Sequence, residues 1–116
     1  MSLEGSCHCG AVSFSVDMPP PKQVIGCNCS ICRRKGFLFS FAPVDAFELK
    51  TGEDNLRSYA FNTHRIVHKF CATCGTEAFA YGAMRDGVEM RAINVRCIPS
   101  VDLEALEIEP YDGASK

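Results

Sequence analysis

The sequence predicts an all-β domain that bound metal helps to hold together. Two observations support this fold class. The chain of 116 residues contains roughly eight short apolar runs, most of them alternating, with turn residues between them and few helical turns. Seven of its eight cysteines fall into three short clusters, at residues 7–9, 27–32 and 71–74. Thiols this close in sequence converge on one point when a soft divalent metal holds them there.

Length and composition limit the remaining possibilities. A chain of this length is expected to form one domain, residues 1–116, and an apolar fraction of 47% suffices for a modest core. A net charge of −2 argues against a general nucleic-acid or membrane surface. The sequence shows neither a signal peptide nor an apolar run long enough to cross a membrane. We therefore expect a soluble, cytoplasmic protein.

The first third of the chain predicts strands around the central cysteine cluster. Residues 11–16 alternate between apolar and serine side chains, which is typical of a half-buried strand. The prolines at 19–21 end that strand, because proline has no backbone N–H to donate. A short strand at 23–26 leads into the central cluster, and residues 37–42 are so apolar that a buried strand is expected.

The rest of the chain continues the same pattern. Further strands are expected at residues 48–51, 56–61, 65–70, 76–81, 88–95 and 107–111. Turns or loops are expected at residues 52–55 and 82–87, and helical turns at residues 43–47 and 101–106.

The cysteines allow more than one interpretation. An even count also suits a disulfide framework, and clustered thiols can be redox-active. A Cys-x-Cys pair cannot easily close on itself, however, and a reducing compartment keeps most thiols reduced. Metal ligation is therefore the favoured interpretation.

Ligand counting suggests how the thiols divide. Structural zinc takes four protein ligands, whereas zinc that performs chemistry takes three and keeps one position open. The first division is a closed site of Cys7, Cys9, Cys71 and Cys74 and an open site of Cys27, Cys29 and Cys32. A zinc ribbon of Cys29, Cys32, Cys71 and Cys74 is the alternative. Spacing favours the first division, since one six-residue segment supplies three ligands, but it does not exclude the second.

Three motifs together resemble one known family. Gly5-Ser-Cys-His-Cys-Gly10, Cys27-x-Cys-x-x-Cys32 and Phe70-Cys-x-x-Cys-Gly75 look like those of the glutathione-dependent formaldehyde-activating enzymes. Residues 28–36 and 59–64 most resemble the centromere protein V branch. The resemblance implies an Mss4-like β-tent stapled by two zinc ions per chain, one structural and one functional, on the four and three cysteines of the first division.

The open site suggests the chemistry. Three thiolates leave a zinc centre with a net negative charge, which weakens it as a Lewis acid but suits it to binding a further thiolate. The resemblance implies that this thiolate is glutathione, the co-substrate, and that it attacks formaldehyde to give S-hydroxymethylglutathione. The protein would then be a carbon–sulfur lyase for small thiols and aldehydes, with Cys27, Cys29 and Cys32 as its catalytic centre.

Other side chains are candidates for binding the co-substrate. Arg33, Arg34 and Lys35 follow the open site and could offset its charge or contact the carboxylates of glutathione. His64 could supply a proton. The alternative is that the basic run is a solvated turn and that His64 is a surface residue.

The remaining polar and sulfur-containing residues suggest no further site. His8 lies between two ligands as a spacer, and His68 is expected to alternate along a strand. Glu77 and Glu89 have no partner in the sequence, so no acid–base dyad is expected. Cys97 is expected to be a small buried core residue.

Two rival functions stay open. The first is a non-enzymatic interaction domain of the centromere protein V type, in which both zinc ions are structural. The second is an enzyme similar to the methionine sulfoxide reductases, which would need Cys97 as its nucleophile.

Overall fold

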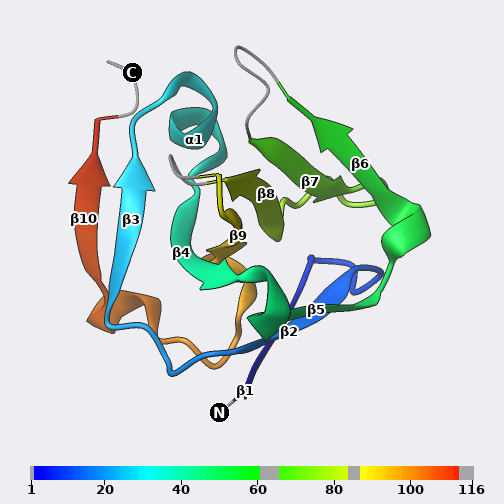
Figure 1. Cartoon of the computed structure of the whole chain (residues 1–116), viewed down its shortest axis with the longest axis horizontal. Helices are drawn as coiled ribbons and strands as arrows, with labels where there is room; N and C mark the ends of the chain where they lie inside the picture. The colour runs from blue at the N-terminus through cyan, green and yellow to red at the C-terminus, as the bar shows by residue number, and fades with distance from the viewer. Residues whose placement is uncertain (1, 61–65, 84–86, 113–116) are drawn as a thin grey trace.

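The computed structural model of the chain describes residues 2–60, 66–83 and 87–112, and most of the regular structure in them is β-strand (Figure 1). This confirms the predicted all-β class. The strands are β1 (Ser2–Ser6), β2 (Ser13–Asp17), β3 (Gln23–Cys27), β4 (Leu38–Pro43), β5 (Phe47–Thr51), β6 (Leu56–Tyr59), β7 (Val67–Cys71), β8 (Phe79–Ala83), β9 (Glu89–Asn94) and β10 (Glu107–Tyr111). The helical segments are α1 (Ser30–Lys35) and the 3-10 turns η1 (Val44–Ala46), η2 (Glu53–Asn55), η3 (Val95–Cys97) and η4 (Leu103–Ala105).

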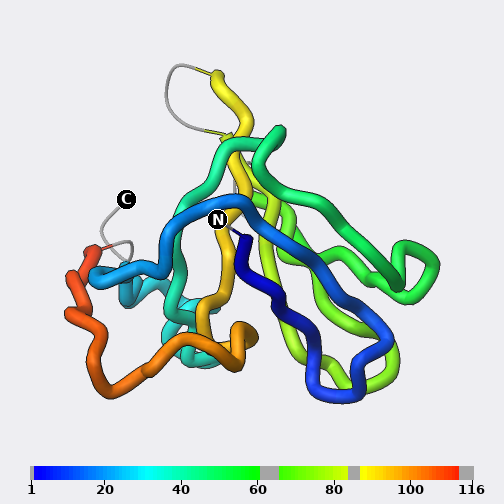
Figure 2. Tube along the Cα trace, turned by 90° about the horizontal axis from the view of Figure 1, so that it is seen from below, coloured from blue at the N-terminus to red at the C-terminus, as the bar shows by residue number. Residues whose placement is uncertain are grey.

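The strands form two sheets. The small sheet has the order β1-β2-β5, and the large sheet has the order β10-β3-β4-β9-β8-β7-β6. Neighbouring strands are antiparallel except for β10 and β3, which run parallel. Figure 2 shows the blue N-terminal hairpin of the small sheet beside the yellow-green segment near residue 70. The two sheets therefore meet where the first and third cysteine clusters lie.

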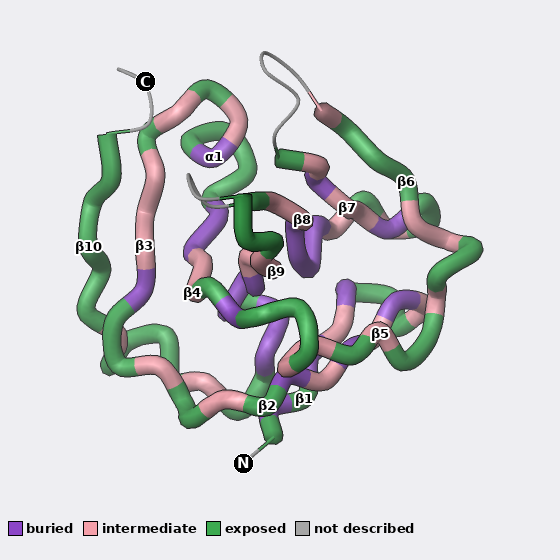
Figure 3. Tube along the Cα trace, in the orientation of Figure 1, coloured by how far each residue is buried: buried purple, intermediate pink, exposed green. Residues whose placement is uncertain are grey.

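Aromatic side chains fill the space between the sheets. Phe14 of β2 and Phe79 of β8 are fully buried, and their ring centroids are 5.9 Å apart. Phe47 of β5 lies 5.6 Å from Phe14 and 4.9 Å from Phe79. Figure 3 shows buried segments, in purple, in strands of both sheets. Offset and edge-to-face aromatic pairs of this kind stabilise a core beyond their buried area.

The alternation in residues 11–16 gives the expected half-buried strand. Val12, Phe14 and Val16 are buried, while Ser13 and Ser15 are only partly covered. The strand begins at Ser13 rather than at residue 11, because the chain first turns through the first cysteine cluster.

The prediction of a fully buried strand at residues 37–42 is wrong in part. The strand is present as β4, but Phe41 is 43% exposed. Successive side chains of a strand point to opposite faces of a sheet, and Leu38 and Ala42 occupy the buried face here. Phe39 and Phe41 point to the other face, where they pack edge to face with ring centroids 5.3 Å apart. Phe39 and Phe41, at alternate positions, thus form a partly exposed aromatic pair.

Two elements have no counterpart in the predictions. β1 was not expected, because it has only Leu3 as a large apolar residue, yet it pairs with β2 along its whole length. No helix was predicted at the central cluster, but α1 forms there and ends at Gly36, whose φ of 69° lies in the left-handed region. Gly36 tolerates this conformation without strain, and its N–H donates to the carbonyl of Cys32 at 3.0 Å.

Other boundaries shift by a few residues. The strand expected at 76–81 begins only at Phe79, because the preceding residues turn around the third cysteine cluster. The helical turns expected at 43–47 and 101–106 appear as the shorter η1 and η4. The predicted strands at 56–61 and 65–70 lie partly outside the described residues. No helix in the described part of the chain is long and apolar enough to cross a membrane.

Candidate metal centres

Four cysteines come together where the two sheets meet. Cys7 and Cys9 belong to the turn between β1 and β2. Cys71 ends β7, and Cys74 lies in the turn that follows it. Their four sulfur atoms lie within 4.8 Å of one another. We call these four residues the closed cluster.

The sulfur spacing in the closed cluster fits a tetrahedral ion. The Sγ atoms of Cys7 and Cys9 are 3.7 Å apart, and those of Cys9 and Cys71 are 3.6 Å apart. Sulfurs bound to one zinc at about 2.3 Å would be about 3.8 Å apart, whereas a disulfide bond is about 2.05 Å long. All eight cysteines are free thiols, so the disulfide framework is not formed.

Hydrogen-bond donors surround the sulfur of Cys71. The backbone N–H of Thr73 and the side-chain amide of Asn55 both donate to it at 3.3 Å. Backbone N–H groups, first that of Cys74, lower the pKa of Cys71. Because these donors favour the thiolate, they prepare this sulfur to bind a cation.

The other cluster thiols differ in their protonation. The hydroxyl and the backbone N–H of Thr76 lower the pKa of Cys74 to about 5. The backbone N–H of Ala11 favours the thiolate of Cys9, but burial and the neighbouring thiols outweigh it and raise its pKa to about 11. The closed cluster therefore holds thiols with lowered pKa, Cys71 and Cys74, beside one with a raised pKa, Cys9.

The remaining three clustered cysteines form a second group. Cys27 ends β3, Cys29 is the N-cap of α1 and Cys32 lies in the first turn of that helix. Their sulfurs also lie within 4.8 Å of one another. Residues three apart in a helix share one side of it, which explains why Cys29 and Cys32 point to the same place. We call these three residues the open cluster.

Burial sets the protonation of the open cluster. It raises the pKa of Cys27 and, more strongly, that of Cys32. Burial acts in the same direction on Cys29, but the backbone N–H groups of Cys32 and Ile31 outweigh it, so the pKa of Cys29 is lowered. The open cluster thus has one thiol inclined to ionise between two that hold their protons more tightly.

The grouping decides between the two divisions of the cysteines. Cys29 and Cys32 lie with Cys27, and Cys71 and Cys74 lie with Cys7 and Cys9. The zinc ribbon is therefore wrong, and the division into four and three is the one that the fold forms. Each of the two clusters could hold a metal ion, and an all-sulfur ligand set favours zinc.

The basic residues after the open cluster do not act as one group. Arg33 and Arg34 are exposed, and one guanidinium N–H of Arg34 donates to the carbonyl of Ser30 at 2.8 Å. Lys35 instead turns inward, and its Nζ lies 2.7 Å from Oε1 of Glu77. His64 lies outside the described residues.

The expectation that Glu77 has no partner is wrong. Its side chain is only 2% exposed, and both of its carboxylate oxygens accept hydrogen bonds. Oε1 accepts from Lys35, and Oε2 accepts from Nδ1 of His68 at 2.6 Å. The three residues come from α1, from β7 and from the segment before β8, which only tertiary folding brings together.

One signal in the sequence could have revealed this network. Each of the three residues stands three positions from a clustered cysteine: Lys35 from Cys32, His68 from Cys71 and Glu77 from Cys74. If the clusters are close in space, side chains at the same short offset from them are close as well.

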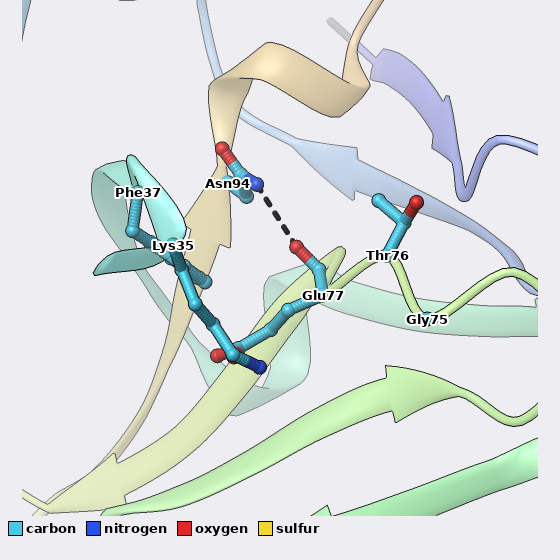
Figure 4. A pocket seen from close by; sticks show the side chains of 6 residues that line it. All are labelled: Lys35, Phe37, Gly75, Thr76, Glu77 and Asn94. Atoms are coloured by element: carbon cyan, nitrogen blue, oxygen red, sulfur yellow. Dashed lines mark hydrogen bonds and ion pairs between the residues drawn. The ribbon is translucent and has the colours of Figure 1, made fainter. Parts of the chain in front are cut away.

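The network lies beside a cavity of about 320 Å³. Figure 4 shows Lys35 reaching toward Glu77, with Phe37 and Asn94 beside it. The amide of Asn94 donates to the backbone carbonyl of Glu77 at 2.9 Å. The cavity is lined by Lys35, Phe37, Gly75, Thr76, Glu77 and Asn94.

Cys97 belongs to the core, as expected. It is buried in the same cluster of apolar residues as Phe14, and burial raises its pKa to about 11. A thiol that holds its proton this tightly is a poor nucleophile at neutral pH, which argues against the enzyme similar to the methionine sulfoxide reductases.

Comparisons with known proteins agree with this arrangement. The family described as "Glutathione-dependent formaldehyde-activating enzyme" matches residues 2–110. A Halomonas elongata protein named "Putative glutathione-dependent formaldehyde-activating enzyme" is 62% identical over 34 residues. That match covers 29% of this chain and 22% of the relative.

A solved structure shares the fold. The crystal structure of a Rhodobacter sphaeroides protein is 30% identical in sequence and superposes with a TM-score of 0.79. The superposition covers 92% of this chain and 100% of that one. A family match over nearly the whole chain, together with clusters of four and three cysteines, gives the identity: this chain belongs to the glutathione-dependent formaldehyde-activating enzyme family.

Proposed function

We propose that the protein is a zinc-dependent carbon–sulfur lyase that forms and cleaves the adduct of a small thiol and a small aldehyde, S-hydroxymethylglutathione or a close analogue. The observation that carries this proposal is the difference between the clusters. Four sulfurs complete a tetrahedral site in one, whereas the other offers three in the part of the chain that the structure describes. A site with one position left for an outside ligand is the arrangement that chemistry requires.

The two clusters would each hold one zinc ion. Cys7, Cys9, Cys71 and Cys74 would hold the structural ion, and Cys27, Cys29 and Cys32 the functional one. Zinc in the open cluster would supply a centre that keeps an incoming thiol ionised at neutral pH. The catalytic contribution of the three cysteines is then to bind this ion and leave a position for glutathione.

The exposed residues near the open cluster would bind the rest of glutathione. Arg33 and Arg34 lie on the solvent side of α1, where they could pair with its carboxylates. His64 stays a candidate proton donor of this proposal. A reducing compartment such as the cytoplasm suits both the free thiols and a glutathione-dependent reaction.

Metal analysis and a thiol titration test the proposal. The purified protein should contain two zinc ions per chain, and glutathione at millimolar concentration should bind to it. Cys29→Ala should abolish this binding while the zinc of the closed cluster stays in place. Cys97→Ala, which removes a core thiol outside both clusters, should bind glutathione as the unchanged protein does. A single zinc ion per chain, or glutathione binding that survives Cys29→Ala, would contradict the proposal.

An interaction domain of the centromere protein V type is the second candidate. Large apolar side chains on the large sheet and beside it favour this function, because Phe41 and Ile108 are largely exposed to solvent. In this case both zinc ions would be structural, and glutathione at millimolar concentration would not bind. The same titration therefore separates the two candidates.

A further inference from the structure

The cavity beside Glu77 is lined by residues that are hydrogen-bonded to both clusters. On one side, the backbone N–H of Phe37 donates to the carbonyl of Cys32 at 3.3 Å, so this wall is attached to the open cluster. On the other side, the carbonyl of Thr76 accepts from the N–H of Cys71 at 3.0 Å, so that wall is attached to the closed cluster. Lys35 and Cys32 are three residues apart in α1 and therefore lie on the same side of the helix, about 5–6 Å apart at Cβ.

Lys35 is the donor in this cavity that is best placed to meet a ligand. Its side chain is 31% exposed, whereas that of Glu77 is 2% exposed. An ammonium group has three N–H donors, and within the described residues only the bond to Glu77 uses one of them. The ammonium also lies 5.0 Å from the centre of the Phe70 ring, which restricts where it can point. Two donors are thus left for an oxygen that enters the cavity.

The charges in the cavity select a neutral ligand. The ammonium of Lys35 and the carboxylate of Glu77 compensate each other at 2.7 Å, so the site has no excess positive charge to attract a carboxylate. The amide of Asn94 and the backbone of Gly75 and Thr76 add polar groups, and the ring of Phe37 adds an apolar wall. A small carbonyl compound fits these groups, because it has one oxygen that accepts a hydrogen bond and no charge.

We propose that this cavity is the aldehyde site, in which Lys35 donates to the carbonyl oxygen of the aldehyde, while Glu77, anchored by His68, holds Lys35 in position. This proposal deepens the proposed function and rests on it for the reaction. Lys35 is then a catalytic residue, whereas Glu77 and His68 are positioning residues, because they act through Lys35.

The reaction balances with these groups. The thiolate sulfur of glutathione forms a bond to the carbonyl carbon, and the π-electron pair of the C=O bond moves to the oxygen beside the Lys35 ammonium. That oxygen then takes a proton from water, which replaces the proton that the thiol released on ionising. A hydrogen-bond donor fixed at the position of a developing oxyanion typically contributes on the order of 100-fold to the rate.

Kinetics of the zinc-loaded protein test the role of Lys35. The rate of the protein-free reaction is first subtracted. Lys35→Met should then lower kcat about 100-fold and leave the KM for glutathione unchanged. Lys35→Arg keeps a cationic donor and should restore the rate to within about tenfold of the unchanged protein. Glu77→Gln should lower kcat about tenfold, again without a change in the KM for glutathione. Lys50→Met, which removes an exposed lysine of β5, is the control and should behave as the unchanged protein does.

The opposite results are equally clear. If Lys35→Met keeps the full kcat, or changes only the KM for glutathione, Lys35 does not contact the aldehyde oxygen. If Lys35→Arg is as slow as Lys35→Met, a cationic donor is not what the site needs. The zinc content of each variant is measured, so that a variant that fails to fold is recognised. Because Lys35 is partly exposed, its variants should fold, and they test the proposal even if Glu77→Gln does not fold.

A binding experiment tests the cavity without the reaction. Formamide is a stable, neutral carbonyl compound of aldehyde size. It should shift the amide NMR signals of Gly75, Thr76 and the side chain of Asn94, and Lys35→Met should remove these shifts. Acetate at the same concentration should shift them less. If formamide leaves these signals unchanged, or acetate shifts them more, the aldehyde site is wrong. If formamide shifts them but the protein accelerates no reaction of glutathione with formaldehyde, the cavity stands and the proposed function fails.

Discussion

At the scale of single residues, the turn after β5 in the small sheet requires a glycine. Gly52 follows β5 with a φ of 94°, which side chains other than glycine rarely adopt. A Cβ atom at this position would lie 2.4 Å from the carbonyl oxygen of Ala11 and 2.7 Å from Cα of Val12. Both contacts are with backbone, so neither can give way by a change of rotamer.

Gly52→Ala should therefore be more damaging than an alanine at an uncrowded left-handed glycine. We expect it to lower the free energy of unfolding by about 2–4 kcal/mol, from backbone strain and steric overlap together. Gly87→Ala is the matched control, because Gly87 has a φ of 87° and, apart from its chain neighbours, no atom of the described residues lies within 4 Å of its Cβ position. Gly87→Ala should lower the free energy of unfolding by about 1–2 kcal/mol, from backbone strain alone. Denaturant unfolding of both variants measures the difference. Equal losses of unfolding free energy would show that the backbone around Gly52 moves to relieve the overlap.

The thiol pKa values predict the order in which metal is lost in acid. A group whose pKa is lowered by folding contributes stability above its unfolded pKa, and that contribution is lost as the pH falls through the folded value. This applies to Cys74, whose pKa is about 5, and in the same direction to Cys71. Burial instead raises the pKa of Cys27 and Cys32, which are two of the three open-cluster thiols, whereas in the closed cluster burial and the neighbouring thiols raise the pKa of Cys9. Protons therefore compete at higher pH for a larger share of the open cluster.

On acidification from about pH 8, the open cluster should release its zinc first and the closed cluster at a lower pH, because the closed cluster offers four sulfur ligands rather than three. A chromogenic zinc indicator should record two steps of equal size. Cys29→Ser should remove the first step and keep the second. Release of both ions in one step would show that the two clusters do not differ in proton competition.

At the scale of secondary-structure elements, the two sheets depend on aromatic contacts. Phe79 of β8 contacts Phe14 of β2 and Phe47 of β5, and so joins the large sheet to the small one. Phe41 of β4 contacts only its neighbour Phe39 among the aromatic pairs of the described chain, and it stands on the open face. Phenylalanine therefore stabilises the contact between the sheets on the buried face of the large sheet, but not on its exposed face.

Phe79→Ala should lower the free energy of unfolding by about 3–5 kcal/mol, because it leaves a cavity between the sheets. Phe41→Ala should change it by less than about 1 kcal/mol, since little buried area is lost. Thermal unfolding of the two variants, each with its zinc content measured, provides the comparison. Similar losses for both would mean that the open face of β4 is covered in solution.

At the scale of the whole molecule, the closed cluster would act as a cross-link once it holds a metal ion. The sulfurs of Cys9 and Cys71 lie side by side, although 62 residues separate them in the chain. A metal ion on this cluster would fasten the β1–β2 turn to the end of β7, and its binding energy would be part of the folding energy. The open cluster draws its three ligands from one short segment and fastens little else.

Loss of one ligand should therefore have different consequences in the two clusters. Cys74→Ser should lower the free energy of unfolding by about 2–5 kcal/mol, the range seen when a native cross-link is removed from a small domain. Cys29→Ser should retain most of the stability and lose the second zinc ion. Chemical denaturation with metal analysis measures both effects, and a larger loss for Cys29→Ser would reverse the assignment of structural and functional sites.

The sequence by itself determined the features that depend on neighbours in the chain. Alternation of apolar residues predicted most strands, since the period of two belongs to the strand itself. Cysteine spacing favoured the division into four and three, because Cys27, Cys29 and Cys32 lie within six residues, but only the tertiary structure brings Cys7 and Cys9 to Cys71 and Cys74. The helix α1 was missed, since a six-residue segment with three basic residues and one cysteine has no apolar period. Only the tertiary structure decided that Phe41 is exposed and that Lys35, His68 and Glu77 meet. These contacts depend on how the sheets are paired and covered, and side chains from three distant segments meet only once packing has fixed the position of each.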